Sequence, residues 1–311
     1  MHFLAGSTVY GLAEAGGGLP SARYQYDGLL QVAEWGQQVI AASEDGGIVI
    51  LGPNEHRHLI SGVPERVECL IPTREDHADL LIGTEGAHLY RLREDGDPAQ
   101  RIESFEQLPC RDQWRTPWGA PPSVRSLAQT SDGWVYADIH VGSIMRSYDN
   151  GTTWEPVTPT LNEDVHQVAV TTAAHDHVYA NTARGVYISG DRGTTWQHRA
   201  ADLQERYGRA IAVHPNNPSV ILASVSNGPH GDDVHGQLYR SEDGGRTWQH
   251  VRNGFPESTR RNINTFHVAF AQDGTAWAAV GRDLFAGSRD GTEWSHYGEA
   301  PCEIRIITCG L

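Results

Sequence analysis

The sequence predicts an all-β protein, a seven-bladed β-propeller with four-stranded antiparallel blades. Three observations point to this fold class. A short polar motif recurs at intervals of 42 to 52 residues, runs of alternating apolar and polar residues separate its copies, and 34 glycines and 16 prolines supply turns along 311 residues. Closed all-β folds of this length are commonly one domain. We therefore expect a single domain over residues 1–311.

The recurring motif reads Ser-x-Asp-x-Gly-x-Thr-Trp. Complete copies stand at 147–154, 189–196 and 241–248, a copy one residue shorter at 288–294, and a truncated copy without the final Thr and Trp at 43–47. In turns, Ser and Asp side chains bond backbone amides and Gly adopts angles that other residues resist, while Trp buries a large ring. We expect each motif to form the turn before the fourth strand of a blade, with a structural role only.

Strand signals fill the interval before each motif. The clearest unit has three runs at 165–170, 177–180 and 185–189, in which β-branched and aromatic residues alternate with polar ones between turn residues. Short strands repeating at this period are typical of propeller blades. The expected blades are at about 29–60, 67–103, 124–157, 165–200, 208–251, 264–298, and 302–311 plus 1–20.

The seventh expected blade combines both ends of the chain. Residues 303–308 predict its innermost strand, and residues 3–6 and 9–12 predict the next two. Closing the ring in this way removes exposed sheet edges. The one helical signal is a single turn near 202–206.

Charge and composition exclude several classes of partner. Lys and Arg number 24 against 39 Asp and Glu, so the net charge of −15 opposes binding to a nucleic acid. No apolar run is long enough for a membrane-spanning helix, and the N-terminus does not resemble a signal peptide. We expect a cytoplasmic protein with no membrane partner, in which Cys69, Cys110, Cys302 and Cys309 are free thiols.

Charged side chains recur at the starts of the predicted innermost strands, around the mouth of the central channel. Arg125, His166 and Arg209 occupy equivalent positions, each two residues before an apolar residue followed by Ala. Arginines converging on one mouth would hold a carboxylate or phosphate, because guanidinium binds such groups bidentately. Alternatively, each arginine pairs with an acidic neighbour, and the sequence offers Glu68, Glu163, Asp164 and Glu303.

These positions also allow a catalytic role. Arg125 and Arg209 would hold an anion, while His166 or His267 would act as general base near neutral pH. Other candidates for ligand binding at strand starts and neighbouring turns are Arg66, Glu68, His140 and Arg305.

The connection 104–123 is much longer than most connections in this chain. Loops of such length are usually functional or disordered. It contains Trp114, Arg115 and Trp118, which could form a lid whose aromatic rings stack on a sugar or another planar ligand. Alternatively, both Trp side chains only cover the edge of a blade.

A Gly-rich insert at 227–236 contains His230, Asp232 and His235. These residue types can ligate a divalent metal, and no other cofactor is indicated. A solvated polar loop is the commoner explanation for such an insert.

The motif resembles the Asp-box, or BNR repeat, of a β-propeller superfamily that includes sialidases and other glycosyl hydrolases, sortilin-type receptors and photosystem II assembly factors. The resemblance implies that the boxes lie on the face away from the ligand site. For a sialidase it implies an arginine triad, for which Arg66, Arg125 and Arg209 can be proposed, and a Tyr–Glu pair. No Arg-Ile-Pro motif occurs near the N-terminus, and Tyr207 is only a weak nucleophile candidate, so a classical sialidase is not expected.

Two classes of function follow. The first is a hydrolase or lyase, glycosidase-like, that acts on a small anionic or sugar-like ligand at the mouth. A metal-dependent enzyme with histidine ligands is a variant of it. The second is a non-catalytic scaffold that docks a protein partner, and the fold does not decide between them.

Overall fold

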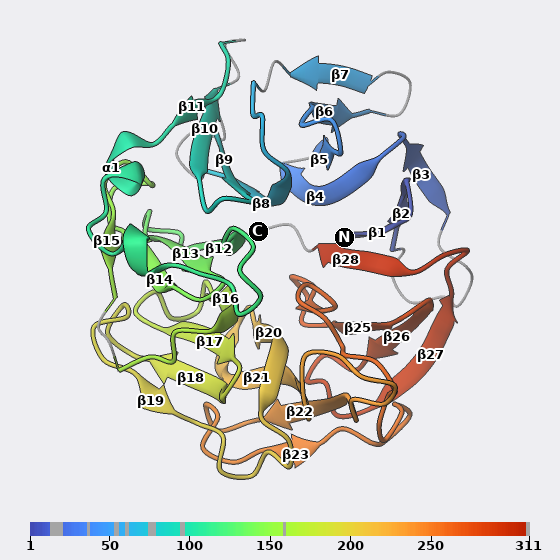
Figure 1. Cartoon of the computed structure of the whole chain (residues 1–311). Coiled ribbons are helices and arrows are strands. Elements are labelled where there is room, and N and C mark those ends of the chain that lie inside the picture. Colours follow the sequence, from blue (N-terminus) through green and yellow to red (C-terminus); the bar gives the residue numbers. More distant parts are fainter. Residues whose placement is uncertain are drawn as a thin grey trace.

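The computed structural model describes residues 1–12, 21–35, 38–52, 56–59, 62–73, 79–93, 97–157 and 160–308. Within these residues, seven four-stranded antiparallel sheets surround a central axis (Figure 1). The prediction of a seven-bladed β-propeller is confirmed.

Six blades follow one another along the chain, each with its first strand at the axis. They consist of β4 (Leu29–Trp35), β5 (Gln38–Ser43), β6 (Ile48–Leu51) and β7 (His56–Leu59); β8 (Val67–Pro72), β9 (Asp79–Thr84), β10 (Leu89–Arg93) and β11 (Gln100–Arg101); β12 (Val124–Gln129), β13 (Val135–Ile139), β14 (Ser143–Ser147) and β15 (Glu155–Pro156); β16 (Val165–Ala169), β17 (Val178–Thr182), β18 (Gly185–Ser189) and β19 (Gln197–His198); β20 (Tyr207–His214), β21 (Asn217–Ser226), β22 (Gln237–Ser241) and β23 (Gln249–His250); and β24 (Val268–Phe270), β25 (Ala276–Val280), β26 (Asp283–Gly287) and β27 (Trp294–Glu299).

The seventh blade joins the two ends of the chain, as expected. Its innermost strand β28 (Ile304–Thr308) pairs with β1 (His2–Ala5), which is followed by β2 (Thr8–Gly11) and β3 (Ala22–Gln25). Strand β3 lies beyond the boundary expected at residue 20, and the parts of the expected unit at 13–20 and 309–311 lie outside the described residues.

Helical structure is confined, in the part of the chain described, to the connection between the second and third blades. It forms α1 (Glu103–Glu106) and a 3-10 turn, η1 (Arg111–Gln113). The helical turn predicted near 202–206 is wrong, because the Gln204 amide there donates to the Tyr239 hydroxyl instead of a helical carbonyl. No helix in the described ranges is long and apolar enough to span a membrane.

The core lies between neighbouring blades, and the Trp of each motif packs against the preceding blade. Trp154 lies in a cluster with Leu81 and Leu89 of the second blade, and Trp196 lies with Tyr136 and Ile144 of the third. The motif Trp residues therefore fill the spaces between blades, as expected.

The complete motifs share one hydrogen-bond network, illustrated by the copy at 189–196. Ser189 Oγ donates to Asp191 and accepts the Gly193 amide, while Asp191 accepts both the amide and the hydroxyl of Thr195. The indole of Trp196 donates to the Gly193 carbonyl at 3.2 Å, whereas the indole of Trp248 donates to the Arg199 carbonyl of the preceding blade. Each complete motif follows the third strand of its blade, which places it on the face opposite the starts of the innermost strands.

The interpretation of 43–47 as a truncated motif is wrong in one respect. This segment connects β5 to β6, the second and third strands of its blade. It therefore lies on the face where the innermost strands begin, although Ser43 still donates to Asp45 as in the motif. The local hydrogen bonds of the motif do not determine its position in the blade.

One carboxyl group is enclosed within the third blade. Asp138 on β13 is fully buried, and its Oδ1 accepts the hydroxyl of Ser126, which in turn accepts the Val168 amide at 2.9 Å. Its Oδ2 has no hydrogen-bond partner. Burial raises the pKa of Asp138 to about 7, against the opposing effects of Ser126 and Arg125.

Asp191→Ala tests the contribution of the motif to stability. The variant loses both hydrogen bonds to Thr195, so we expect the free energy of unfolding to fall by about 1 kcal/mol at this exposed site. Burial opposes a low pKa for Asp191, but the hydrogen bonds from Thr195 and Ser189 outweigh it and lower the pKa. The difference from wild type is therefore present at neutral pH and disappears below about pH 4. Urea denaturation measures this difference in the free energy of unfolding, and the exposed Asp112→Ala is the control. Equal stability of the two variants would contradict a stabilising role for the motif.

Asp138→Asn tests the enclosed carboxyl. Between about pH 4 and pH 7 the unfolded state releases this proton and the folded state keeps it, so stability falls as the pH rises. One such group contributes a slope of up to about 1.4 kcal/mol per pH unit. We expect the variant to lose this component in urea denaturation from pH 4 to 8, whereas Asp112→Asn keeps it. If the free energy of unfolding of Asp138→Asn depends on pH as steeply as that of wild type, the raised pKa of Asp138 is refuted.

Candidate functional site

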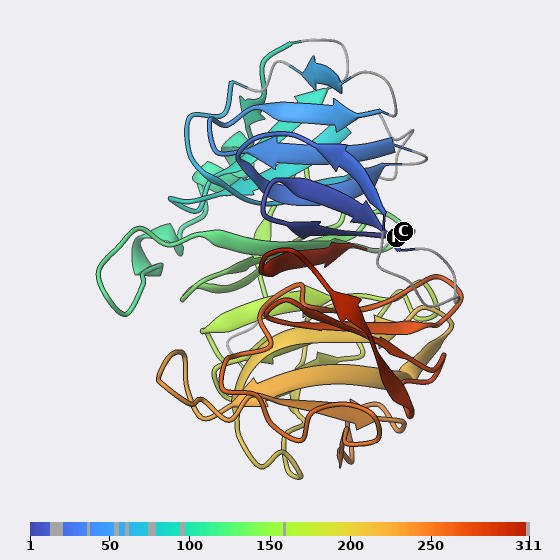
Figure 2. The same cartoon turned by 90° about the vertical axis from the view of Figure 1, so that its right-hand side faces the viewer.

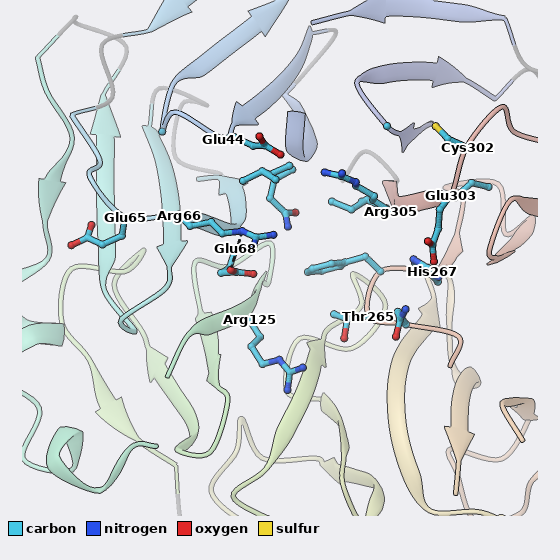
Figure 3. A pocket seen from close by; sticks show the side chains of 18 of the residues that line it. Glu44, Glu65, Arg66, Glu68, Arg125, Thr265, His267, Cys302, Glu303 and Arg305 are labelled. Atoms are coloured by element: carbon cyan, nitrogen blue, oxygen red, sulfur yellow. Dashed lines mark ion pairs between the residues drawn. The ribbon is translucent and has the colours of Figure 1, made fainter. Parts of the chain in front are cut away.

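A cavity of about 860 Å³ opens where the innermost strands begin. Figure 3 shows Arg66, Glu68 and Arg125 on one side of it and His267, Glu303 and Arg305 on the other. Of the predicted site residues, those that line the cavity are Arg66, Glu68, Arg125, Arg209, His267 and Arg305. The strands converge on the axis, so residues as far apart in the chain as Gly6 and Ile306 share one wall.

Two of the four arginines at the cavity, Arg66 and Arg305, have no buried N–H group that lacks a partner. Arg66 Nε lies 3.4 Å from Glu68 Oε1, and Arg305 Nη1 donates to the Leu29 carbonyl at 3.0 Å. For Arg66 the alternative of pairing with an acidic neighbour therefore holds.

The other two arginines, Arg125 and Arg209, differ. Within the described part of the chain neither has a carboxylate at ion-pair distance, and Arg125 Nη1 and Arg209 Nε are buried without a hydrogen-bond partner. Arg209 Nη2 donates to the Pro229 carbonyl at 3.2 Å, and its guanidinium lies over the ring of Tyr207. Burial lowers the pKa of Arg209. Unpaired cationic N–H groups at a cavity are donors available to an anion.

Three of the acidic residues that line the cavity have an arginine nearby, and Glu44 and Asp45 also belong to its wall. Glu68 faces Arg66, Glu65 pairs with Arg101, and Glu303 lies 3.5 Å from Arg261. These pairs offset part of the negative charge of the wall. Arg125 and Arg209 have no carboxylate at ion-pair distance among the described residues, although the charge of Asp164 acts on both and that of Glu68 on Arg125.

The structure does not support His166 or His267 as general base. His166 has a relative exposure of 0%, and its ring nitrogens face the Gly208 carbonyl and Asp164. Burial lowers the pKa of His166 despite Asp164. His267 lines the cavity but is 4% exposed, and burial lowers its pKa to about 4. A substrate cannot reach the first ring, and the second is a weak base.

His140 is held below the ring of Trp118. The two rings meet edge to face with centroids 4.8 Å apart. Burial, and then the nearby charge of Arg125, lower the pKa of His140 to about 3. His140 is therefore neutral at physiological pH. It is not one of the residues that line the cavity.

The connection 104–123 extends outward from the face on which β12 begins (Figure 2). Arg115 ties it to the next loop, because its amide donates to the Val141 carbonyl and its guanidinium pairs with Glu163. Trp114 is buried against Phe105 in the core, so the prediction that its ring stacks on a ligand is wrong. Trp118 is 64% exposed and presents a free aromatic face.

The insert 227–236 is held by hydrogen bonds to the chain around Arg260. The Val234 amide donates to the Arg260 carbonyl, and the Arg260 side chain donates through Nε to the Asp232 carbonyl. Throughout the described ranges, no group of three or more His, Cys, Asp or Glu side chains is arranged to hold a metal ion. The structure therefore does not bring His230, Asp232 and His235 together as a ligand set.

Phe266 is a cavity residue that the predictions missed. It adopts φ of 64°, and its amide donates to Gln167 Oε1 at 3.1 Å. A left-handed backbone at an aromatic residue costs about 1–3 kcal/mol and persists only where the surroundings impose it. No sequence signal indicates such a conformation, although its position directly before His267 was a hint of the location.

Comparisons with known proteins support the propeller superfamily. Residues 142–273, less than half of the chain, match the family described as Sortilin-Vps10, "Sortilin, neurotensin receptor 3". A probable oligoxyloglucan-reducing end-specific xyloglucanase from Neosartorya fischeri is 26% identical over 193 residues. That match covers 54% of this chain, and it spans only 23% of the length of the relative.

Several solved structures share the fold. An ancestral GH74 enzyme has a TM-score of 0.67 at 16% identity, over 86% of this chain and 38% of its own. The WD40 β-propeller domain of Doa1 has a TM-score of 0.62 at 11% identity, over 91% and 86%. YCF48 bound to D1 peptide has a TM-score of 0.57 at 12% identity, over 95% and 84%. The chain is thus a β-propeller with partial sequence similarity to Sortilin-Vps10 and to a xyloglucanase.

Proposed function

We propose that the mouth cavity binds a small anionic ligand, a carboxylate in particular, through Arg125 and Arg209. The observation that carries this proposal is the pair of guanidinium groups with buried, unpartnered N–H groups at the cavity. A buried donor without a partner costs about 1–3 kcal/mol, and more when it is charged. A carboxylate that accepts these N–H groups would remove this cost.

The protein as a whole is acidic, with a net charge of −15. Anion binding must therefore depend on short-range contacts and not on long-range attraction. A carboxylate suits this requirement because its two oxygens match the forked donors of arginine. Carboxylates of this kind include sugar acids and the free end of a peptide, and a peptide is the ligand named for YCF48.

A second function, hydrolysis of an acidic glycoside, is favoured by Glu68. Burial raises the pKa of this carboxyl, and the nearby Glu85 adds to the effect, against the opposing charges of Arg66 and Arg125. A carboxyl with a raised pKa holds its proton to a higher pH, which favours donation of that proton to a leaving group as general acid. The partial similarity to a xyloglucanase supports a glycosidase-like reaction. In this proposal Glu68 replaces the histidines.

Arg125→Met and Arg209→Met test anion binding. Each variant removes one set of charged donors worth about 1.5–3 kcal/mol, so we expect affinity for acetate and glucuronate to fall by about 10- to 100-fold. Isothermal titration calorimetry measures the affinities. Arg115→Met is the matched control, because Arg115 pairs with Glu163 away from the cavity. Unchanged affinity in both cavity variants, or no binding of either acid to wild type, would refute the proposal.

Glu68→Gln tests glycoside hydrolysis. With p-nitrophenyl glucuronide, we expect kcat to fall by roughly 100-fold or more, the usual contribution of a general acid, while glucuronate affinity changes little. The wild-type rate should fall as the pH rises through the raised pKa of Glu68, because only the protonated carboxyl donates. If wild type hydrolyses the glucuronide no faster than the buffer blank, the proposal of hydrolysis is refuted. The proposal of anion binding is not affected by that result.

A further inference from the structure

A second cavity, of about 250 Å³, occupies the central channel beyond the mouth. Most of its wall is apolar and comes from the middle of the innermost strands, including Val32, Leu70, Leu127, Val168, Ile211 and Ile307. Its one charged lining residue within the described chain is Glu34, near the end of β4 away from the mouth. Gln31, Gln129, Gln167 and Thr308 add polar atoms to this wall, but its larger part is apolar and favours an apolar group.

The two cavities adjoin. Gln31, Phe266 and Ile306 line both of them. Phe266 packs against the core cluster of the second and third blades and also against the cluster of the first and seventh. Its side chain therefore extends across the axis, between the arginine-lined mouth and the apolar channel.

The backbone of Phe266 is held in place from two sides. Gln167 accepts its amide, and the Ile307 amide donates to its carbonyl at 2.8 Å. Gln167 is itself bound to Ile211 through both of its side-chain polar atoms. These bonds impose the left-handed φ of 64° and direct the ring into the channel. The half-buried ring is thus the barrier between a polar and an apolar compartment.

We propose that the ligand is an amphipathic acid, a monocarboxylate with an unbranched aliphatic chain. Its carboxylate binds Arg125 and Arg209, and its chain passes Phe266 into the apolar channel. This inference rests on the proposed anion binding and specifies the ligand class. Each buried methylene contributes about 0.8 kcal/mol, so affinity should rise about fourfold per methylene until the channel is filled.

Two kinds of variant separate the contribution of the ligand's carboxylate from that of its aliphatic chain. Ala128 and Ala269 are half-buried small residues in the channel wall, so Ala128→Phe and Ala269→Phe fill the channel from opposite blades. Ala201→Phe, at an exposed site, is the matched control. Phe266→Gly removes the barrier and suits the left-handed backbone, because Gly adopts positive φ without strain.

Calorimetry with acetate, butyrate, hexanoate, octanoate and decanoate tests the proposal. In wild type and Ala201→Phe we expect affinity to rise with chain length. In Ala128→Phe and Ala269→Phe the affinity for the longer acids should be the same as the affinity for acetate. In Phe266→Gly, stopped-flow association of octanoate should be faster, with acetate unchanged.

The outcomes distinguish the two proposals. If acetate does not bind wild type, the anion site fails and the inference fails with it. If acetate binds in an Arg125-dependent way and chain length has no effect, only the amphipathic ligand is refuted. If chain-length dependence survives in both Ala128→Phe and Ala269→Phe, the chain lies elsewhere and the inference is overturned.

Discussion

The pairing of β28 with β1 is the constraint on which the rest of this structure depends. Four residue pairs, from His2–Thr308 to Ala5–Ile304 with a register shift before the last, close seven blades into a ring. An open ring would leave a long sheet edge at each end, which is a template for aggregation. Closure also brings Arg305, on the last strand, against Leu29 at the start of the first blade. The same contact that completes the fold therefore completes the wall of the mouth cavity.

The complete motifs and the cavity lie at opposite ends of the blades. The innermost strands all begin on one face, which holds the cavity, and the complete motifs follow the third strands on the other face. The segment 43–47 shows that this separation comes from topology, because similar Ser–Asp hydrogen bonding occurs there on the face that holds the cavity. The motif residues stabilise a turn wherever the chain reverses direction. The position of that turn in the blade decides whether the turn lies near the cavity.

At the mouth, burial determines which charged residues remain available. The imidazole groups of His166 and His267 are enclosed and their pKa values lowered by burial, whereas Arg125 and Arg209 keep unsatisfied donors. The recurrence of charged residues at equivalent strand starts was a sound guide to their location. It could not distinguish a side chain that reaches the cavity from one that the next blade covers, because His166 is closed off by Gly208, 42 positions later.

The sequence alone determined the repeating unit, the closure by both termini and the face that carries the site, because these follow from local periodicity, turn chemistry and the need to pair sheet edges. Only the tertiary structure decided that Trp114 belongs to the core, that the insert at 227–236 assembles no metal ligands, and that Phe266 stands between two cavities. Each of these depends on contacts between blades, for example between Trp114 and Phe105 or between Phe266 and Gln167. Such contacts join residues with no fixed spacing in the sequence, so no local pattern encodes them.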